Sequence, residues 1–319
     1  MTEFTPDTAA FLAAHDWLGG TARAIAGDLS NRRYTRLEKA GARAILMEGS
    51  DASARNAFVA LSRWINTIGL SAPRVFAEDT THNLLLLEDF GDAQLTSLIQ
   101  ASPGDAGMYY KTAVQALLRI RAETPLALEA PDVATLIEAT RLIDDWYPGA
   151  DGVLLDDIRS VLAEQLSHLF AAPRTVSLRD FHTDNIIWLA DRENTARLGL
   201  LDFQDAFLMH PAYDLMSLIT DARIDVSRER RDALIRAFAA QSDQSVEEVA
   251  RAVAILGVQR NLRILGIFCR SARRDGKSHH LPALPRVRRY LHDCLSHEVF
   301  NELSDHLERA VPALNEAMV

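Results

Sequence analysis

The chain has 319 residues, of which 48% are hydrophobic and 24% are charged, and its formal net charge is -10. Such a length allows two lobes with separate cores, and the composition is that of a globular protein rather than a disordered or fibrous one. The acidic balance argues against non-specific binding to nucleic acid, because phosphate backbones attract basic surfaces.

The compartment can be inferred from what the sequence contains and lacks. The two cysteines, Cys269 and Cys294, have no metal-type spacing, which favours a reducing environment over a disulfide scaffold. The segment Met1–Thr8 has no basic region of the kind that opens a signal peptide. No apolar run approaches the roughly 20 residues that a membrane helix needs. We therefore expect a cytoplasmic protein without a membrane segment.

The first 90 residues predict a small lobe that is rich in strands. Helical periodicity extends over residues 4–18 and 52–68. The segments Tyr34–Leu37 and Ala42–Met47 predict two strands joined by a turn at Lys39–Gly41, and Leu84–Leu87 predicts a buried strand.

The pattern becomes mainly helical after Gly91. Helical segments are predicted from about residue 94 to 170 and from Pro211 to the end, with strand-like residues at 175–203 between them. We therefore place a boundary between residues 1–90 and residues 91–319. Strands grouped early and helices grouped late predict an α+β fold.

Three polar residues near the middle of the chain predict a reactive site. Asp180 lies five residues before Asn185, and Asp202 follows a second short apolar run. The turn-rich segment Asp191–Asn194 between the apolar runs predicts a hairpin, in which Asn185 lies opposite Leu201. Asn185 and Asp202 then emerge at the same end, and Asp180 lies on the loop that leads to it.

This combination suits phosphoryl transfer. Mg²⁺ takes a few protein oxygen ligands and leaves the remaining positions to water and phosphate, and Asn185 and Asp202 can supply those oxygens. A separate carboxylate, Asp180, can orient an acceptor hydroxyl and receive its proton. The spacing of the three residues matches the template of protein kinases. A metallohydrolase that uses Asp180, His182, Asp184 and His210 is an alternative, but no second histidine motif completes its metal shell.

The layout resembles the aminoglycoside phosphotransferase and choline kinase-like superfamily, on the evidence of Asp180, Asn185, Asp202-Phe203 and the segment Pro211–Leu215. The resemblance implies a bilobal, protein kinase-like fold with a small strand-rich N-terminal lobe and a large, mainly helical C-terminal lobe. It also implies ATP or another nucleoside triphosphate and Mg²⁺ as cofactors, Asp180 as the catalytic base, and Asn185 and Asp202 as metal ligands. Asp214 is expected to support the catalytic loop.

The expected nucleotide site departs from the family pattern. The turn at 27–31 lies where a phosphate-covering loop belongs, and it predicts contacts from Ser30, Asn31, Arg32 and Arg33. Kinases of this kind carry a lysine on the next strand, whereas this chain has Met47 there, so Arg32, Arg33 or Arg36 is expected to supply the positive charge. The missing lysine also leaves open a catalytically weak pseudokinase.

The segment after the buried strand resembles the hinge that binds adenine through its backbone. It predicts nucleotide contacts from Glu88 and Phe90.

Several motifs point to one branch of the superfamily. These are Arg179–His182, Gly199–Ala206, Gln259–Leu262 and Leu284–Val287, which resemble bacterial anomeric kinases of N-acetylmuramate and N-acetylglucosamine. A small-molecule acceptor of this kind predicts a carboxylate contact from Arg260 or Arg263 and a sugar-stacking contact from Trp146 or Tyr147. An aminoglycoside, choline or homoserine acceptor is the alternative.

Overall fold

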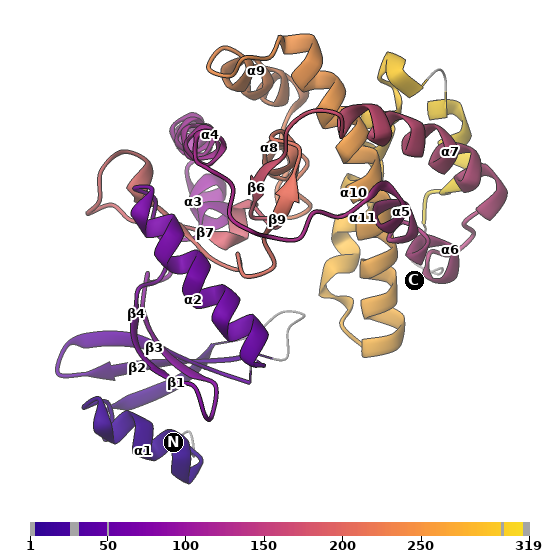
Figure 1. The fold of residues 1–319 in the computed structure, drawn as a ribbon. Coiled ribbons are helices and arrows are strands. Elements are labelled where there is room, and N and C mark those ends of the chain that lie inside the picture. Colours follow the sequence, from indigo (N-terminus) through magenta and orange to yellow (C-terminus); the bar gives the residue numbers. More distant parts are fainter. Residues whose placement is uncertain (1–3, 26–31, 50, 301–302, 315–319) are drawn as a thin grey trace. The chain divides into compact units, whose positions relative to one another are not determined.

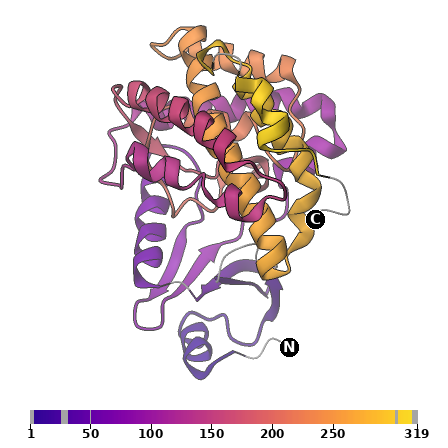
Figure 2. The same cartoon turned by 90° about the vertical axis from the view of Figure 1, so that its right-hand side faces the viewer.

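In the computed structural model the described residues are 4–25, 32–49, 51–300 and 303–314. The chain divides into two compact units: the first comprises Met1–Ala101 with Asn185–Asp205, and the second comprises Ser102–Asp184 with Ala206–Val319. Figures 1 and 2 trace both units from the N-terminus to the C-terminus. The predicted boundary after Phe90 therefore differs from the observed division, in which a later segment returns to the first unit.

A five-stranded antiparallel sheet forms the centre of the first unit (Figure 1), with strand order β1-β2-β3-β5-β4. Its strands are β1 (Thr21–Ile25), β2 (Arg33–Lys39), β3 (Ala42–Glu48), β4 (Val75–Asp79) and β5 (Leu84–Glu88). Ala40 and Gly41 join β2 to β3 with φ values of 51° and 82°, as a tight two-residue hairpin turn requires. The predicted turn and its two strands are thus confirmed.

Three helices complete the first unit: α1 (Pro6–Ala14), α2 (Ala52–Thr67) and α3 (Leu95–Ala101). Phe11 and Leu12 of α1 form a core with residues on one face of the sheet, among them Leu46. The side chains of Thr5 and Asp51 cap the first turns of α1 and α2 by accepting backbone N–H bonds, which explains where these helices begin.

A short hairpin joins the first unit from far along the chain. It consists of β7 (Ile186–Trp188) and β8 (Leu198–Leu200). The Oγ of Ser71 donates to the carbonyl of Ala196 at 2.6 Å, and the backbone of Ser71 forms a β-bridge with Gly199. These bonds explain why residues 185–205 belong with the sheet and not with the helices.

The second unit is mainly helical. In its described residues the α-helices are α4 (Ala106–Ala122), α5 (Val133–Glu138), α6 (Leu142–Trp146), α7 (Gly152–Leu169), α8 (Tyr213–Ile219), α9 (Arg228–Ala239), α10 (Val246–Asp275), α11 (Leu284–Leu295) and α12 (Leu307–Ala310). A two-stranded sheet pairs β6 (Thr175–Ser177) with β9 (Phe207–Met209). The predicted α+β composition, with early strands and late helices, is therefore confirmed.

Helix α10 is the central helix of the second unit. It begins at a capping box formed by Ser245 and Glu248 and ends at Gly276, which has a φ of 68°. By length and composition it could cross a membrane, but most of its apolar stretch is buried, as in the core helix of a soluble protein. A Cβ added at Gly257 would lie 2.5 Å from the Sγ of Cys294 on α11, so glycine allows the two helices to approach closely.

Both cysteines are free thiols buried in the second unit. Burial raises the pKa of Cys269 to about 11 and that of Cys294 to about 12.

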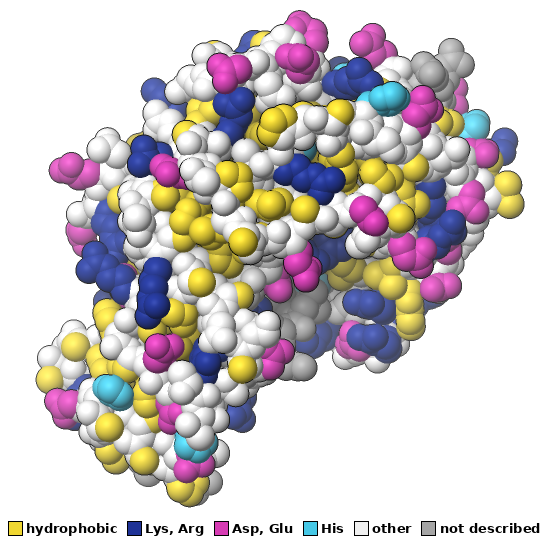
Figure 3. All heavy atoms as spheres, in the orientation of Figure 1, with side chains coloured by type: hydrophobic (Ala, Val, Ile, Leu, Met, Phe, Trp, Pro, Cys, Tyr) yellow, Lys and Arg dark blue, Asp and Glu magenta, His cyan; other side chains and the backbone are white. Residues whose placement is uncertain are grey.

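Figure 3 shows that acidic and basic side chains are interspersed over the face drawn there, which fits the mixed and mildly acidic composition.

Candidate active site

The hairpin brings two of the predicted metal ligands to the same end. Ile186 pairs with Leu200, and the N–H of Leu201 donates to the carbonyl of Asn185 at 2.9 Å. The predicted register, with Asn185 opposite Leu201, is confirmed. Asp202 follows immediately, so the amide of Asn185 and the carboxylate of Asp202 extend from adjacent strand ends of the first unit.

Asp202 has an unusual backbone and a charged partner. Its φ is 54°, a left-handed value that is uncommon for residues other than glycine and is concentrated at functional sites. Its Oδ1 accepts hydrogen bonds from the Nη2 of Arg32 at 3.2 Å and the Nε2 of Gln204 at 2.8 Å, and its side chain is 45% exposed. Both contacts use Oδ1, which leaves Oδ2 for a cation. The amide oxygen of Asn185 and the Asp202 carboxylate are the hard ligands that Mg²⁺ prefers.

The loop that carries Asp180 belongs to the second unit and is held by a buried carboxylate. Asp214, on α8, accepts hydrogen bonds from the Oγ of Ser177 at 2.7 Å, the N–H of Leu178 at 2.7 Å and the N–H of Arg179 at 3.1 Å. The expected supporting role of Asp214 is confirmed. Burial raises its pKa to about 6, while the three hydrogen bonds oppose that rise.

A second buried carboxylate holds the other side of this loop. Asp221 accepts bonds from the N–H and the Oγ1 of Thr183, at 2.9 and 2.6 Å. Arg179, the last of the residues held by Asp214, has a φ of 71°. Asp221 could not be predicted from the sequence, since nothing in the local spacing connects it with Thr183, 38 residues earlier. Asp180 thus lies on a loop fixed on both sides and turned by a left-handed residue.

Asp180 has a basic neighbour on α10. The Nη2 of Arg260 lies 3.4 Å from the Oδ1 of Asp180, and the Arg260 side chain is 2% exposed. Within the residues that the structure describes, the Nη1 of Arg260 has no hydrogen-bond partner. Arg263 lies one turn further along the helix, and burial lowers its pKa; Arg179 and Arg260 lower it further, while Tyr213 and Asp180 oppose the change. The helix therefore gathers arginines around the predicted base.

The two aromatic residues predicted to meet a sugar differ in exposure. Tyr147 is 4% exposed and its hydroxyl donates to the carbonyl of Pro312 at 2.8 Å, so its assignment to sugar stacking was wrong: the C-terminal segment covers it. Trp146, at the end of α6, is half-buried and stays a candidate.

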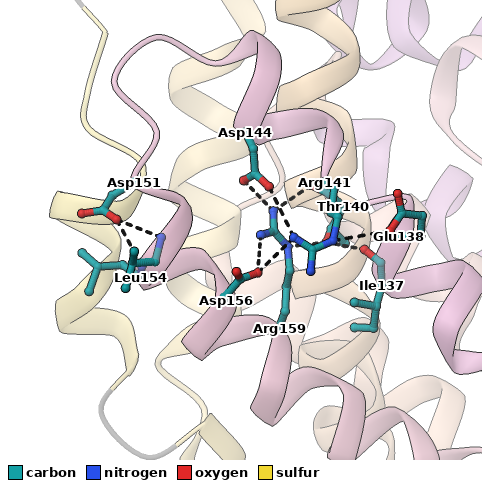
Figure 4. Close-up of polar contacts among 10 residues, drawn as sticks. Ile137, Glu138, Thr140, Arg141, Asp144, Asp151, Leu154, Asp156 and Arg159 are labelled. Atoms are coloured by element: carbon teal, nitrogen blue, oxygen red, sulfur yellow. Dashed lines mark hydrogen bonds and ion pairs between the residues drawn. The ribbon is translucent and has the colours of Figure 1, made fainter.

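Helix α6 is held firmly where it begins. Figure 4 shows Arg159 of α7 between Asp144 and Asp156, with N–O distances of 2.7 and 2.9 Å, and close to Thr140. The Arg159 side chain is 3% exposed, and its pair with Asp144 is largely shielded from solvent, whereas Asp156 is 56% exposed. They fix the segment that ends at Trp146.

The arginines predicted to replace the missing lysine have separate roles. Met47 on β3 is fully buried and is paired in register with Tyr34 and Leu85. Arg36 is bound by Asp89 and Asp92 through contacts of 2.7–2.9 Å, so it connects β2 to the segment after β5.

The remaining nucleotide-site predictions fall partly outside the described residues, because Ser30 and Asn31 lie there. Arg33 has a 72% exposed side chain, 3.9 Å from Glu48. Arg32 contacts Asp202, as described above.

The predicted hinge is engaged through its backbone and its side chains. The N–H of Glu88 donates to the carbonyl of Arg74 at 2.9 Å, and its carboxylate pairs with Arg192. The ring of Phe90 lies against Gly199, where an added Cβ would be 2.6 Å from its Cδ2. Neither of these contacts involves the carbonyl oxygen of Glu88 or the backbone N–H of Phe90.

The metallohydrolase alternative is not supported. His182 and His210 are buried, and burial lowers the pKa of both, that of His210 to about 4. The Nδ1 of His210 accepts the N–H of Ala212. No group of three or more His, Cys, Asp or Glu side chains among the described residues could hold a metal ion.

Comparison with known proteins gives consistent relatives. A family model described as the phosphotransferase enzyme family matches residues 21–253. The N-acetylmuramate/N-acetylglucosamine kinase of Caulobacter vibrioides is 34% identical, covering 95% of this chain and 96% of that protein. The enzyme of the same name from Pseudomonas putida is 28% identical, with 86% and 84% covered.

Solved structures agree at the level of the fold. A choline/ethanolamine kinase family protein from Mesorhizobium loti has a TM-score of 0.66 at 14% identity, covering 95% of this chain and 98% of that one. Choline kinase LicA from Streptococcus pneumoniae has a TM-score of 0.63 at 13% identity, with 91% and 100% covered. The predicted kinase-like fold is thereby confirmed.

Proposed function

Since this chain belongs to the phosphotransferase enzyme family and is a small-molecule kinase, we propose that it phosphorylates the anomeric hydroxyl of a cell-wall amino sugar. The phosphate donor is ATP with Mg²⁺, the acceptor is N-acetylmuramate or N-acetylglucosamine, and the reaction takes place in the cytoplasm. The observation that carries this proposal is the likeness, over nearly the whole chain, to the Caulobacter vibrioides enzyme of that name.

Each polar residue of the candidate site has a distinct proposed task. Asn185 and Asp202 hold Mg²⁺, and the bound ion supplies the positive charge that neutralises the transferring phosphate. Asp180 orients the acceptor hydroxyl and receives its proton. Arg260, 3.4 Å from Asp180, keeps that carboxylate in place.

The chemistry of the acceptor suits an aspartate base. An anomeric hydroxyl is a hemiacetal group, and the ring oxygen withdraws electron density from it, so it gives up its proton more readily than an ordinary alcohol. A carboxylate is a weak base at neutral pH. The anomeric hydroxyl, which gives up its proton most readily, is therefore the hydroxyl of the sugar that Asp180 is best suited to activate.

The nucleotide is proposed to bind the first unit. Adenine presents an amino donor beside a ring acceptor, which matches a carbonyl followed two residues later by an N–H, as Glu88 and Phe90 can provide. Ser30, Asn31, Arg32 and Arg33 are proposed to meet the phosphates.

The acceptor is proposed to bind the second unit. The lactyl carboxylate of N-acetylmuramate is a suitable partner for Arg263 and for the Nη1 of Arg260, which has no hydrogen-bond partner among the described residues. Trp146 is proposed to stack on the sugar. A polycationic aminoglycoside or choline would instead be repelled by Arg260, which lies 3.4 Å from Asp180, and by Arg263 on the same helix. The pseudokinase alternative depends only on the absence of a lysine at Met47.

An acceptor screen tests the proposal directly. Release of ADP would be measured with N-acetylmuramate, N-acetylglucosamine, kanamycin, choline and homoserine, and the product would be examined by phosphorus NMR. We expect turnover with the amino sugars and a phosphate on the anomeric carbon. Turnover with kanamycin or choline and none with either sugar would disprove the acceptor, and no turnover with any acceptor would favour the pseudokinase.

A further inference from the structure

The first unit lacks a cation where kinases place the lysine that binds the α- and β-phosphates. Met47 is fully buried on β3, with Tyr34 and Leu85 as its partners in register. A nucleotide still carries several negative charges into the site. Another positive side chain of this unit is therefore needed to compensate them.

Several cations of this unit already have carboxylate partners elsewhere. Arg36 is bound by two carboxylates, Asp89 and Asp92, and its side chain is 10% exposed. Arg74 and Arg192 both face Glu88. The remaining ion pairs lie at the surface: Lys39 meets Asp16, and Arg33, with a 72% exposed side chain, lies 3.9 Å from Glu48.

Arg32 differs from all of these. Its side chain is 13% exposed, and its Nη2 lies 3.2 Å from the Oδ1 of Asp202, the proposed metal ligand. The same oxygen also accepts from Gln204, whose side chain is buried beneath it. Tyr34 of β2, two residues after Arg32, lies close enough for Arg32 to lower and for Asp202 to raise the pKa of its hydroxyl. Arg32 is thus held, mostly shielded from water, beside the carboxylate that would receive the magnesium ion.

We propose that Arg32 binds the nucleotide phosphates in place of the missing lysine. Before the nucleotide binds, the Asp202 carboxylate holds the Arg32 guanidinium in an ion pair. This inference rests on the proposed kinase function. With nucleotide and Mg²⁺ bound, Asp202 would serve as a ligand of the ion, and it would release the Arg32 guanidinium because of competition for the carboxylate and repulsion between like charges. Its planar set of N–H donors then binds the α- and β-phosphate oxygens.

Binding calorimetry with ADP and adenosine tests this assignment without requiring turnover. Arg32→Ala should weaken the binding of ADP with Mg²⁺ by roughly 10- to 100-fold, the loss of charged hydrogen bonds. Adenosine, which has no phosphates, should bind as it does to the wild type. Arg32→Lys should recover part of the loss. Arg43→Ala, which removes an equal charge from an exposed position of β3, should change neither affinity.

A second comparison tests whether Asp202 holds Arg32 in this way. Without Mg²⁺, Asp202→Ala should strengthen ADP binding, because Arg32 is no longer held by the carboxylate. The double variant Arg32→Ala/Asp202→Ala should show no such gain, whereas a general relief of charge repulsion would persist in it.

The outcomes separate this inference from the proposed function. Equal ADP binding by the wild type and Arg32→Ala, or an equal loss of adenosine binding, would remove Arg32 from the phosphates while leaving the kinase intact. A gain in ADP affinity without Mg²⁺ that persists in the double variant would show that Asp202 does not hold Arg32 away from the phosphates. Failure of the wild type to bind ADP at all would overturn the proposed function and this inference together.

Discussion

The carboxylate of Asp214 accepts the backbone N–H of Leu178 at 2.7 Å, so a buried group on α8 holds the segment that leads to Asp180. Ser177 and Arg179 donate to the same carboxylate. The position of the proposed base is therefore determined by an acid that is itself removed from solvent.

Asp214→Asn should lower both stability and turnover. The amide group turns one acceptor into a donor, which leaves a buried N–H unsatisfied at a cost of about 1–3 kcal/mol. The loop then loses its fixed geometry, and kcat should fall by roughly 10- to 100-fold. Urea unfolding and steady-state kinetics measure the two effects. Asp232→Asn, at an exposed position on α9, is the matched control and should change neither.

The raised pKa of Asp214 predicts opposite pH effects on turnover and stability. Burial places this pKa at about 6, above the ordinary 3.8, so the folded protein binds the proton more tightly than the unfolded chain. The contribution of Asp214 to stability is therefore fully present below 3.8 and is lost as the pH rises through about 6. Turnover should instead fall below about pH 6, because a protonated carboxyl group cannot accept all three bonds.

Unfolding curves of the wild type and Asp214→Asn, measured at several pH values, test the predicted direction of the change in stability with pH. The free energy of unfolding of the wild type, relative to the variant, should rise between about pH 7 and about pH 5. A constant difference across that range would contradict the role of Asp214 titration.

Asp180→Asn should retain nucleotide binding and lose turnover by roughly 10²- to 10⁴-fold, as expected for removal of a general base. Near-normal turnover of Asp180→Asn would exclude this residue as the base.

Arg260→Met should lower kcat by roughly 10- to 100-fold with little change in the KM for ATP, because it removes the partner that positions Asp180. Arg260→Lys should restore part of the loss.

Asp202→Ala and Asn185→Ala should raise the Mg²⁺ concentration for half-maximal turnover by roughly 10-fold or more, since each removes one of two protein oxygens. Asp191→Asn, at an exposed site in the loop at the opposite end of the hairpin, controls for general effects of charge. Magnesium titrations that coincide for all four proteins would refute the metal assignment.

Gly199→Ala should destabilise the first unit by about 1–3 kcal/mol, because the added methyl group would lie 2.6 Å from the Phe90 ring. ADP affinity should fall as well if Phe90 belongs to the hinge. Combining Gly199→Ala with Phe90→Ala should cost less than the two separate losses together, since the clash is then removed. Additive losses would show that the two residues do not compete for space. Gly107→Ala, on α4 with open space around it, should be neutral or slightly stabilising.

The elements that local chemistry determines could be predicted from the sequence. The hairpin register around Asn185 follows from two apolar runs with a turn between them, and it was predicted correctly. The turn at Ala40 and Gly41 was signalled by glycine. The edge strand Thr21–Ile25 was missed because its side chains are mostly exposed and carry no alternating apolar pattern.

Contacts between distant residues could not be predicted in this way. Arg260 was predicted to contact a substrate carboxylate, whereas its burial beside Asp180, 80 residues earlier, depends on how α10 packs. Tyr147 followed a plausible pattern for a sugar-binding residue until the C-terminal segment was seen to cover it. Sequence patterns thus identified the reactive groups, whereas the residues that position those groups depend on tertiary packing.

The buried thiols of Cys269 and Cys294 have a practical consequence. A thiol with a raised pKa holds little thiolate at neutral pH, and neither side chain is accessible to a reagent in the folded state. Maleimide labelling would therefore proceed only through opening of the second unit. Because both residues belong to that unit, the labelling rate would report its local stability in the presence of any candidate acceptor, independently of whether phosphate is transferred.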